Sequence, residues 1–303
     1  MHTRSIDQWQ HGHVFLGASH HQNERKTWMV VGLASAMTVA EIAAGLLFGS
    51  VALVADGLHM STHAGALLIA ALAYLSARRY QGDPRFVFGT GKFGELASFA
   101  SAIVLALIAL LIGYESMTRL MHPIATAFGE ALPIAALGLL VNLASAFLLH
   151  DDDDARRAGH GAHHHDLNLR AAYIHVLADA VTSMLAIVAL SLGWAFGWRW
   201  TDPLAGIAGA LVIANWSWGL MRQAGAVLLD ATPDPELASD IRGALEVAGD
   251  KVTDLHLWRI GPGHRGAIIA LVSHQPKPPA DYKARLAGLA GLSHVTVEVE
   301  ACR

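Results

Sequence analysis

Two apolar runs in this sequence carry ionisable side chains at spacings that suit metal binding. The spacing is i, i+3, i+7 within residues 49–70 and i, i+4 within residues 169–190, so each set falls on one stripe of an α-helix. An ionisable group at bilayer depth costs about 2.5–3.5 kcal/mol on insertion scales, so such residues usually face a partner or a water-filled path. The residues are Asp56, His59 and His63 in the first run, and His175 and Asp179 in the second.

Each of these residues on its own is compatible with a satisfied bundle residue that only hydrogen-bonds to a neighbouring helix. Two separate helices that each carry a His-x-x-x-His or His-x-x-x-Asp pair favour a shared metal site. The single cysteine, Cys302, excludes an intrachain disulfide and a cysteine-based zinc cluster. Metal chemistry in this chain must therefore use nitrogen and oxygen ligands.

The composition is that of a membrane protein. Of the 303 residues, 53% are hydrophobic and only 15% are charged, well away from the soluble average. Crossing a hydrocarbon core of about 30 Å takes about 20 helical residues. Six apolar windows are long enough, near residues 28–48, 50–76, 93–117, 131–149, 171–194 and 203–220.

Basic residues indicate the orientation of the six predicted spans. They gather before the first span and after the second, fourth and sixth, whereas the other side has only Arg119 and Arg199. Both termini are therefore predicted to lie in the cytoplasm, with the protein in the inner (cytoplasmic) membrane. The residues that set this bias are Arg25, Lys26, Arg78, Arg79, Arg85, Lys92, Arg156, Arg157, Arg170 and Arg222.

Further polar residues lie in or near the spans. Glu95 and Glu115 stand close to the ends of the third span and are interpreted as solvated helix ends. Glu41 is deeper in the first span, where it could line a vestibule or relay protons. Asn142 is alone in the fourth span and is most simply an interhelical hydrogen-bonding residue.

Two polar segments flank the spans on the predicted cytoplasmic side. Residues 1–27 form a histidine-containing tail, and residues 150–168 form a His/Asp-rich loop within the six-span membrane domain, residues 28–230. The loop is low in complexity and cannot bury a core. It is either a solvated linker or a tract that gathers metal, and its candidate ligands are His160, His163, His164 and His165.

Residues 231–303 differ in character and predict a small cytoplasmic domain. An amphipathic helix over 236–248 is followed by strands over 252–260 and 265–274, a helix over 280–289 and a strand over 294–300. This α-β-β-α-β order indicates a ferredoxin-like α+β module, so the fold class is an α-helical membrane protein with six transmembrane helices and such a tail. A domain this small is expected to dimerise or to lean on the membrane domain.

The chain resembles the cation diffusion facilitator family over nearly its whole length. The most specific segments are Gly49-Ser50 leading into Ala55-Asp56-Gly57-Leu58-His59, the segment Phe-Gly-Thr-Gly-Lys-Phe-Gly-Glu at 88–95, His175-Val-Leu-Ala-Asp179, and Asp254-Leu-His-Leu-Trp258. The resemblance implies a four-ligand transport site made of His59, His63, His175 and Asp179. It leaves Asp56, one turn earlier, as a second-shell or exit-path candidate.

The resemblance also bears on the choice of metal. Zinc exporters of the family commonly have Asp where this chain has His63. The His-x-x-x-His version, together with Phe15-Leu-Gly-Ala and Trp258-Arg-Ile-Gly-Pro-Gly263, looks like the branch that exports cobalt and nickel.

Accessory metal sites of the family are only partly matched. Between the second and third spans, Asp83 and Thr90 stand without histidine, so an extra site found there in some relatives is predicted to be missing or weak. In the tail, where relatives bind metal at the dimer interface, the candidates are His256, His274 and His294.

The predicted function is proton-coupled export of a divalent transition metal, cobalt(II) or nickel(II) first, with zinc(II) or iron(II) as the alternative. The expected partners are metal ions, protons, the bilayer and a second copy of the chain, with no cofactor and no nucleic acid. An enzyme is not expected, because the sequence has neither a His-Glu-x-x-His motif nor an ATP-binding phosphate loop. A membrane-bound metal sensor is the competing prediction from a different class.

Overall fold

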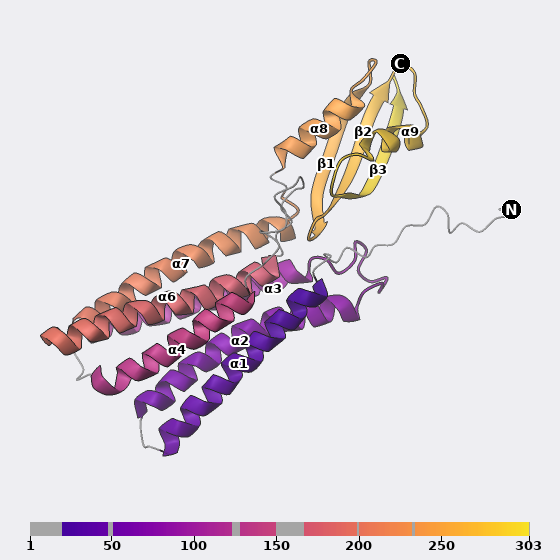
Figure 1. The fold of residues 1–303 in the computed structure, drawn as a ribbon. Coiled ribbons are helices and arrows are strands. Elements are labelled where there is room, and N and C mark those ends of the chain that lie inside the picture. The colour runs from indigo at the N-terminus through magenta and orange to yellow at the C-terminus, as the bar shows by residue number, and fades with distance from the viewer. Residues whose placement is uncertain are drawn as a thin grey trace.

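A bundle of long helices and a small α+β domain beyond one of its ends make up the structure (Figure 1). The computed structural model describes residues 20–47, 51–122, 128–149, 167–198, 200–231 and 234–302. The bundle helices are α1 (His20–Leu47), α2 (Val51–Arg79), α3 (Phe93–Met121), α4 (Phe128–Leu149), α6 (Leu167–Phe196) and α7 (Thr201–Leu228). The end of the bundle that meets the C-terminal domain is called the domain end below.

Hydropathy supports membrane insertion of this bundle. In the described part of the chain, three helices are long and apolar enough to cross a membrane, and Ala135–Leu149 is a shorter apolar helix. The three are Phe93–Met121, Leu169–Phe196 and Pro203–Leu228, the third, fifth and sixth predicted spans. Helices α1, α2 and α4 are present where the other spans are predicted, and their crossing of a membrane stays a prediction.

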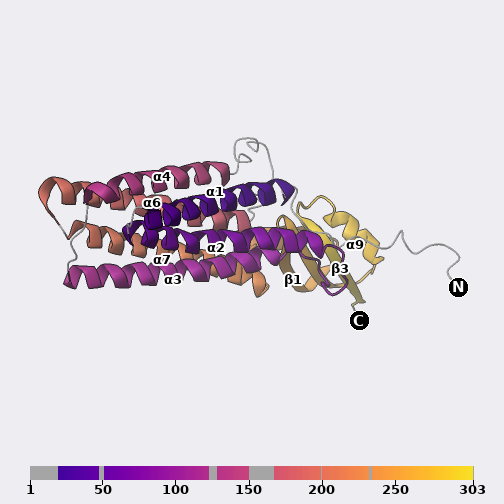
Figure 2. The ribbon, with the colours of Figure 1, turned by 90° about the horizontal axis from the view of Figure 1, so that it is seen from below.

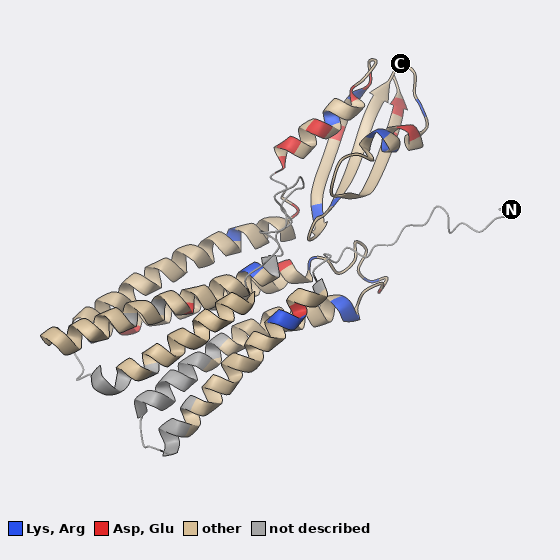
Figure 3. Cartoon of the chain, in the orientation of Figure 1, with Lys and Arg blue, Asp and Glu red and all other residues tan. Residues whose placement is uncertain are grey.

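Charged residues avoid the length of the bundle. Figure 3 shows Lys, Arg, Asp and Glu concentrated near the domain end and in the C-terminal domain, while the described helices are largely free of them. Helix α1 begins at His20, earlier than the predicted start at residue 28, because the helix continues through polar turns that an apolar window does not include. Charged residues at the domain end and apolar residues along the rest of the helices are expected for helices that cross a bilayer and project from it.

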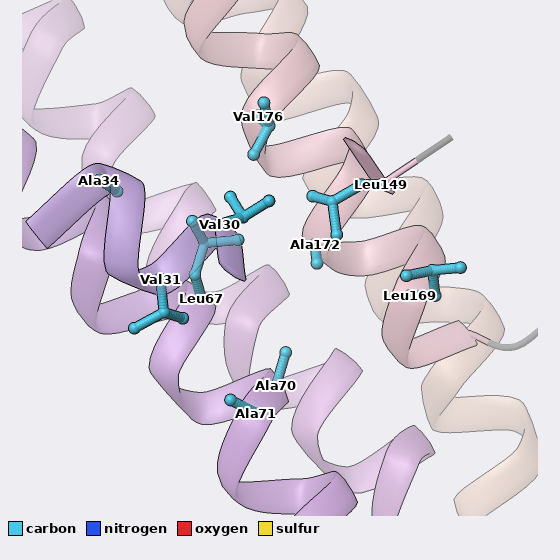
Figure 4. Close-up of a cluster of buried hydrophobic side chains, with 10 residues drawn as sticks. All are labelled: Val30, Val31, Ala34, Leu67, Ala70, Ala71, Leu149, Leu169, Ala172 and Val176. Carbon is cyan, nitrogen blue, oxygen red and sulfur yellow. The ribbon is translucent and has the colours of Figure 1, made fainter. Parts of the chain in front are cut away.

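Four helices share one apolar core near the domain end. The core, called the apolar cluster below, joins α1, α2, α4 and α6 (Figure 4). Its side chains are all nearly inaccessible to solvent, so they form a buried core between the four helices. The members are Val30, Val31, Ala34, Leu67, Ala70, Ala71, Leu149, Leu169, Ala172 and Val176.

Helices α3 and α7 pack against each other through small residues. A Cβ atom at Gly206 would lie 2.1 Å from Ser116 Oγ, and a Cβ at Gly113 would lie 3.6 Å from Ala210 Cβ. Close backbone approach through Gly, Ala and Ser is the usual way for helices to associate in lipid, where water supplies no driving force. Ser217 Oγ also donates a hydrogen bond of 2.7 Å across this pair to the carbonyl of Ala102.

The C-terminal domain has the predicted α-β-β-α-β order. Its sheet has the order β1-β2-β3, with β1 and β2 antiparallel and β2 and β3 parallel. One shared apolar core holds residues of both helices and of all three strands, so α8 and α9 cover the same face (Figure 1). The elements are α8 (Pro235–Leu245), β1 (Lys251–Gly261), β2 (His264–Ser273), α9 (Pro279–Leu286) and β3 (Leu292–Ala301).

Backbone conformation ends α8 earlier than predicted. Asp234 caps its start, accepting a hydrogen bond of 3.1 Å from the backbone N–H of Leu237. The predicted helix ran to residue 248, but Ala248 has φ 59° and Gly249 has φ 91°, both in the left-handed region. The helix already ends at Leu245, because Glu246 has φ −77° and ψ 60°, outside the helical region; the left-handed residues then turn the chain towards β1.

Glu246 joins the end of α8 to β1 and provides a pH-dependent contact. Its carboxylate accepts hydrogen bonds from the backbone N–H of Val252 and from Lys251 Nζ, both at 3.2 Å. The Val252 N–H, followed by Lys251, lowers the pKa of Glu246 below its ordinary value of 4.5. Because the folded-state pKa is depressed, this stabilisation is present above pH 4.5 and is lost as the pH falls through the lowered pKa.

We therefore expect hydrogen-exchange protection at the start of β1 to decline in acid. In the full-length protein, protection factors of peptides covering residues 251–261, corrected for intrinsic exchange, should fall as the pH drops below 4.5. Glu246→Gln should lower protection at neutral pH and remove most of this pH dependence. Equal profiles for the two proteins would show that Glu246 does not hold the strand.

Candidate functional site

Helix α6 holds the half of the predicted metal site that the structure describes in full. His175 and Asp179 are four residues apart, and their exposed fractions are 1% and 7%. His175 Nε2 lies 4.0 Å from Asp179 Oδ2, so the two side chains point to the same side of the helix. An imidazole and a carboxylate placed this way, deep in a membrane-spanning helix, are suited to share a divalent cation.

The other predicted ligands lie on α2. Asp56, His59 and His63 belong to the helix Val51–Arg79, so the predicted stripe is on a continuous helix. Their side chains lie outside the described residues, and so do those of Glu41, on α1, and of the loop histidines at 160 and 163–165. For the half of the predicted site on α2, the structure gives the position of the helix within the bundle.

Packing of α2 on α6 brings the two halves to one depth. Leu67 of α2 and Val176 of α6 belong to the same apolar cluster (Figure 4). One turn further from the domain end, α2 reaches His63 and α6 reaches Asp179, because the two helices are antiparallel. The predicted ligands therefore come from facing segments of two helices in contact.

A polar contact lies beside the Asp179 half-site. Asn142 of α4 is 5% exposed, and its Nδ2 donates a hydrogen bond of 3.5 Å to Ser183 Oγ of α6. Ser183 is one turn beyond Asp179 on α6. The prediction that Asn142 is an interhelical hydrogen-bonding residue is confirmed.

The predicted role of Glu95 as a solvated helix end is wrong. Glu95 is 1% exposed, and its Oε1 lies 3.9 Å from Arg259 Nη2 of β1, so the C-terminal domain covers it. The sequence does not indicate this contact, because Arg259 lies in the C-terminal domain, far from Glu95 along the chain. Glu115, at the other end of α3, is exposed and forms an ion pair with Arg119, as a helix-end residue should.

The C-terminal domain docks on the loop between α2 and α3. Phe88 of that loop contacts Trp258 and His294 edge-on, with ring centroids 5.4 and 5.6 Å away. Lys92, just before α3, forms an ion pair with Asp230, just after α7. Figure 2 shows the strands at this end of the bundle. The domain is therefore tied to the bundle by the aromatic contacts of Phe88 and by the Arg259–Glu95 ion pair.

The three histidines predicted as accessory ligands lie in different places. His256 is exposed on β1 and pairs with Asp254 at 2.8 Å, His274 follows the end of β2, and His294 contacts Phe88. Among the residues whose side chains are described, no three His, Cys, Asp or Glu residues lie close enough to hold one metal ion. An accessory site within one chain is not formed by these histidines, and a site shared between two copies stays a prediction.

The residues of this bundle match those of a known family of membrane transporters. The family model for the cation efflux transmembrane domain matches residues 27–229. The chain belongs to the cation diffusion facilitator family, as the resemblance of its motifs predicted.

Several characterised relatives cover almost the whole chain. The zinc transporter ZitB of Escherichia coli (strain K12) is 31% identical over 303 residues, covering 96% of this chain and 91% of the relative. The cadmium, cobalt and zinc/H(+)-K(+) antiporter of Bacillus subtilis (strain 168) is 28% identical, covering 94% and 92%. The cation efflux system protein CzcD of Alcaligenes sp. (strain CT14) is 29% identical, covering 94% and 90%.

The names of these relatives change the expected metal. Zinc is named for two of the three relatives described, cobalt for one and nickel for none. These names do not support the prediction that placed cobalt and nickel ahead of zinc.

Proposed function

We propose that this protein exports zinc(II) from the cytoplasm across the inner membrane in exchange for protons. The observation that carries the proposal is the buried pair His175 and Asp179 on a membrane-spanning helix that packs against α2. Family membership and the antiporter named among the relatives support transport coupled to an ion gradient.

In this proposal His59, His63, His175 and Asp179 form the transport site. Three imidazoles and one carboxylate make a four-ligand set suited to tetrahedral zinc or cobalt. Imidazole binds metal only when neutral, so loading the site releases protons and protonation from the far side helps to eject the metal. Asp56 is the candidate for the exit path. No step requires a resident cofactor or ATP.

The proposed architecture has six spans with both termini in the cytoplasm. Residues 1–27 form the tail, residues 28–230 the transport domain, and residues 231–303 a ferredoxin-like cytoplasmic domain that takes part in a homodimer. The loop histidines at 160 and 163–165 gather metal at the cytoplasmic mouth, and His256, His274 and His294 are accessory ligands between two copies. Charged residues at the domain end and a ten-member core in the C-terminal domain support this division.

Reconstituted vesicles test the proposal. With an imposed pH gradient, proteoliposomes should accumulate zinc, followed by cobalt, in preference to nickel, iron(II) and manganese. Protein-free vesicles, and proteoliposomes whose gradient is collapsed with an ionophore, should show no accumulation. If zinc uptake does not depend on the gradient, antiport is refuted. If no metal moves at all, the competing role as a membrane-bound metal sensor is favoured.

Cobalt is the second candidate substrate, because His63 stands where zinc exporters of the family commonly have Asp. Replacing imidazole by carboxylate adds a negative charge and removes a softer ligand. His63→Asp should therefore raise zinc transport relative to cobalt, measured with both metals in the same proteoliposomes. Thr27→Val, at a buried position on α1 near the domain end, serves as a control that leaves the ratio unchanged. An unchanged ratio in His63→Asp would show that residue 63 does not select the metal.

A further inference from the structure

Thr38 of α1 has a buried hydroxyl group that no bond within the described part of the chain explains. Thr38 is 8% exposed, and its Oγ1 has no hydrogen-bond partner among the described residues. Buried polar atoms almost always have a partner, so each exception requires an explanation. A helical threonine usually donates to the carbonyl four residues earlier, as Thr27 of the same helix does to Asn23 at 2.8 Å. Thr38 does not use this bond.

The pairing of α1 with α2 sets the depth of Thr38. Near the domain end, Glu24 lies 3.4 Å from Arg78, and Val31 shares the apolar cluster with Leu67 (Figure 4). The two helices are antiparallel and advance equally along the bundle axis. Counting from either pair places Thr38 level with residues 60–64 of α2, the turn that contains His63.

The pairing of α1 with α4 gives the same depth independently. Val30 and Ala34 share the apolar cluster with Leu149, and Ala146 packs against it. The same count along these antiparallel helices places Thr38 level with Asn142, the residue bonded to Ser183 beyond Asp179. Further from the domain end than the apolar cluster, each of the four helices thus carries polar residues at the same depth in the bundle.

This polar level includes two helices that supply none of the predicted ligands. Helix α2 contributes His59 and His63, helix α6 contributes Asp179, and α1 and α4 contribute Thr38 and Asn142. A histidine that binds metal through one ring nitrogen almost always donates its other N–H to an oxygen atom, which fixes the ring's tautomer and orientation. A threonine hydroxyl has lone pairs that can accept such a bond.

We propose that Thr38 is a positioning residue of the transport site, whose hydroxyl oxygen accepts a hydrogen bond from a ligand imidazole of α2. The proposal rests on the proposed function, because it assumes that α2 supplies histidine ligands. The bond keeps the ligating nitrogen directed at the metal, so its loss weakens metal binding more than it slows release.

Thr38→Val removes the hydroxyl group and keeps the shape of the side chain. In zinc uptake by proteoliposomes, we expect the KM of this variant to rise roughly tenfold to a hundredfold, as for other lost partners of ligating histidines, with a much smaller change in kcat. Thr38→Ser retains the hydroxyl and should restore most of the affinity. The matched control is Thr27→Val, because the Thr27 hydroxyl donates to Asn23 of its own helix and to no other group in the described part of the chain; its KM should stay that of wild type.

A spectroscopic measurement tests the same bond without transport. Cobalt(II) bound to the purified full-length protein should give visible bands of tetrahedral coordination, weakened and shifted in Thr38→Val but retained in Thr38→Ser and Thr27→Val. This measurement decides the matter if Thr38→Val reconstitutes poorly. A wild-type KM or a wild-type cobalt spectrum in Thr38→Val overturns the proposal. If Asp179→Ala transports zinc normally, it is the proposed function that fails.

Discussion

Asp179→Ala is expected to abolish metal transport, with a fall in zinc uptake of at least about a hundredfold. The substitution removes the only carboxylate of the proposed ligand set, which leaves three neutral imidazoles to hold a divalent cation. Asp179 is buried on α6, and its Oδ2 lies 4.0 Å from His175 Nε2. Removal of a directly ligating group should exceed the tenfold to hundredfold loss of about 1.4–2.7 kcal/mol typical of outer partners.

The measurement is initial zinc uptake by proteoliposomes at matched protein content. Asp179→Asn keeps the shape and removes the charge, so it should be nearly as inactive as Asp179→Ala. Glu115→Gln serves as the control, because Glu115 is exposed at the far end of α3 and pairs only with Arg119 among the contacts described. Normal uptake by Asp179→Ala, with a size-exclusion profile like that of wild type, would show that the metal binds elsewhere.

Gly206→Val is expected to cause a large loss of stability in the helix bundle. The new Cβ would lie 2.1 Å from Ser116 Oγ and 3.1 Å from Ser116 Cβ, so a change of serine rotamer alone cannot make room. Overpacking of this kind typically costs about 1–3 kcal/mol, and in a bundle it forces α3 and α7 apart. Thermal unfolding in detergent, followed by loss of the monodisperse size-exclusion peak, should shift to lower temperature.

Two companion variants make this expectation specific. Gly219→Val lies on the same helix, where an added Cβ meets nothing within 4 Å, so only the smaller helix-propensity change should remain. Ser116→Gly combined with Gly206→Ala should be more stable than Gly206→Ala alone, because the clashing atoms are gone. Equal stability of the Gly206 and Gly219 valine variants would show that the α3–α7 contact is looser than the structure has it.

Local patterns predicted the elements of this protein well. Alternation and turn residues gave the order of the C-terminal domain, and apolar windows gave the positions of the long helices. The errors are at boundaries and contacts. The apolar face of residues 236–248 extends past Leu245, but the backbone leaves the helical region at Glu246, and periodicity does not report backbone dihedral angles.

The contacts between distant segments were beyond the reach of those patterns. Glu95 looked like a wetted helix end because nothing nearby in the sequence covers it, whereas Arg259, far along the chain, does. The sequence does not mark Thr38 as a site residue, because a threonine in an apolar helix usually donates a hydrogen bond to the backbone of its own helix. Its depth relative to His63 and Asn142 depends on how α1 packs between α2 and α4, which only the three-dimensional arrangement gives.

The identity of the metal was the weakest inference for a different physical reason. Affinity for a nitrogen and oxygen site rises from cobalt through nickel to copper and falls at zinc, so the donor set alone does not select zinc or cobalt. The choice depends on geometry within the site and on which metal the cell supplies. In vesicles the experimenter sets the metal supply, so a change of selectivity in His63→Asp would report the contribution of the site itself.

The apolar cluster has a consequence for permeation. Buried apolar side chains such as Leu67, Val176 and Leu149 pack together near the domain end, and they offer no polar group to a cation. A partly dehydrated divalent ion would face a large electrostatic barrier inside this apolar cluster. In the proposed transport cycle, an ion that reaches the site between these four helices from the domain end would require this packing to open and then to close again.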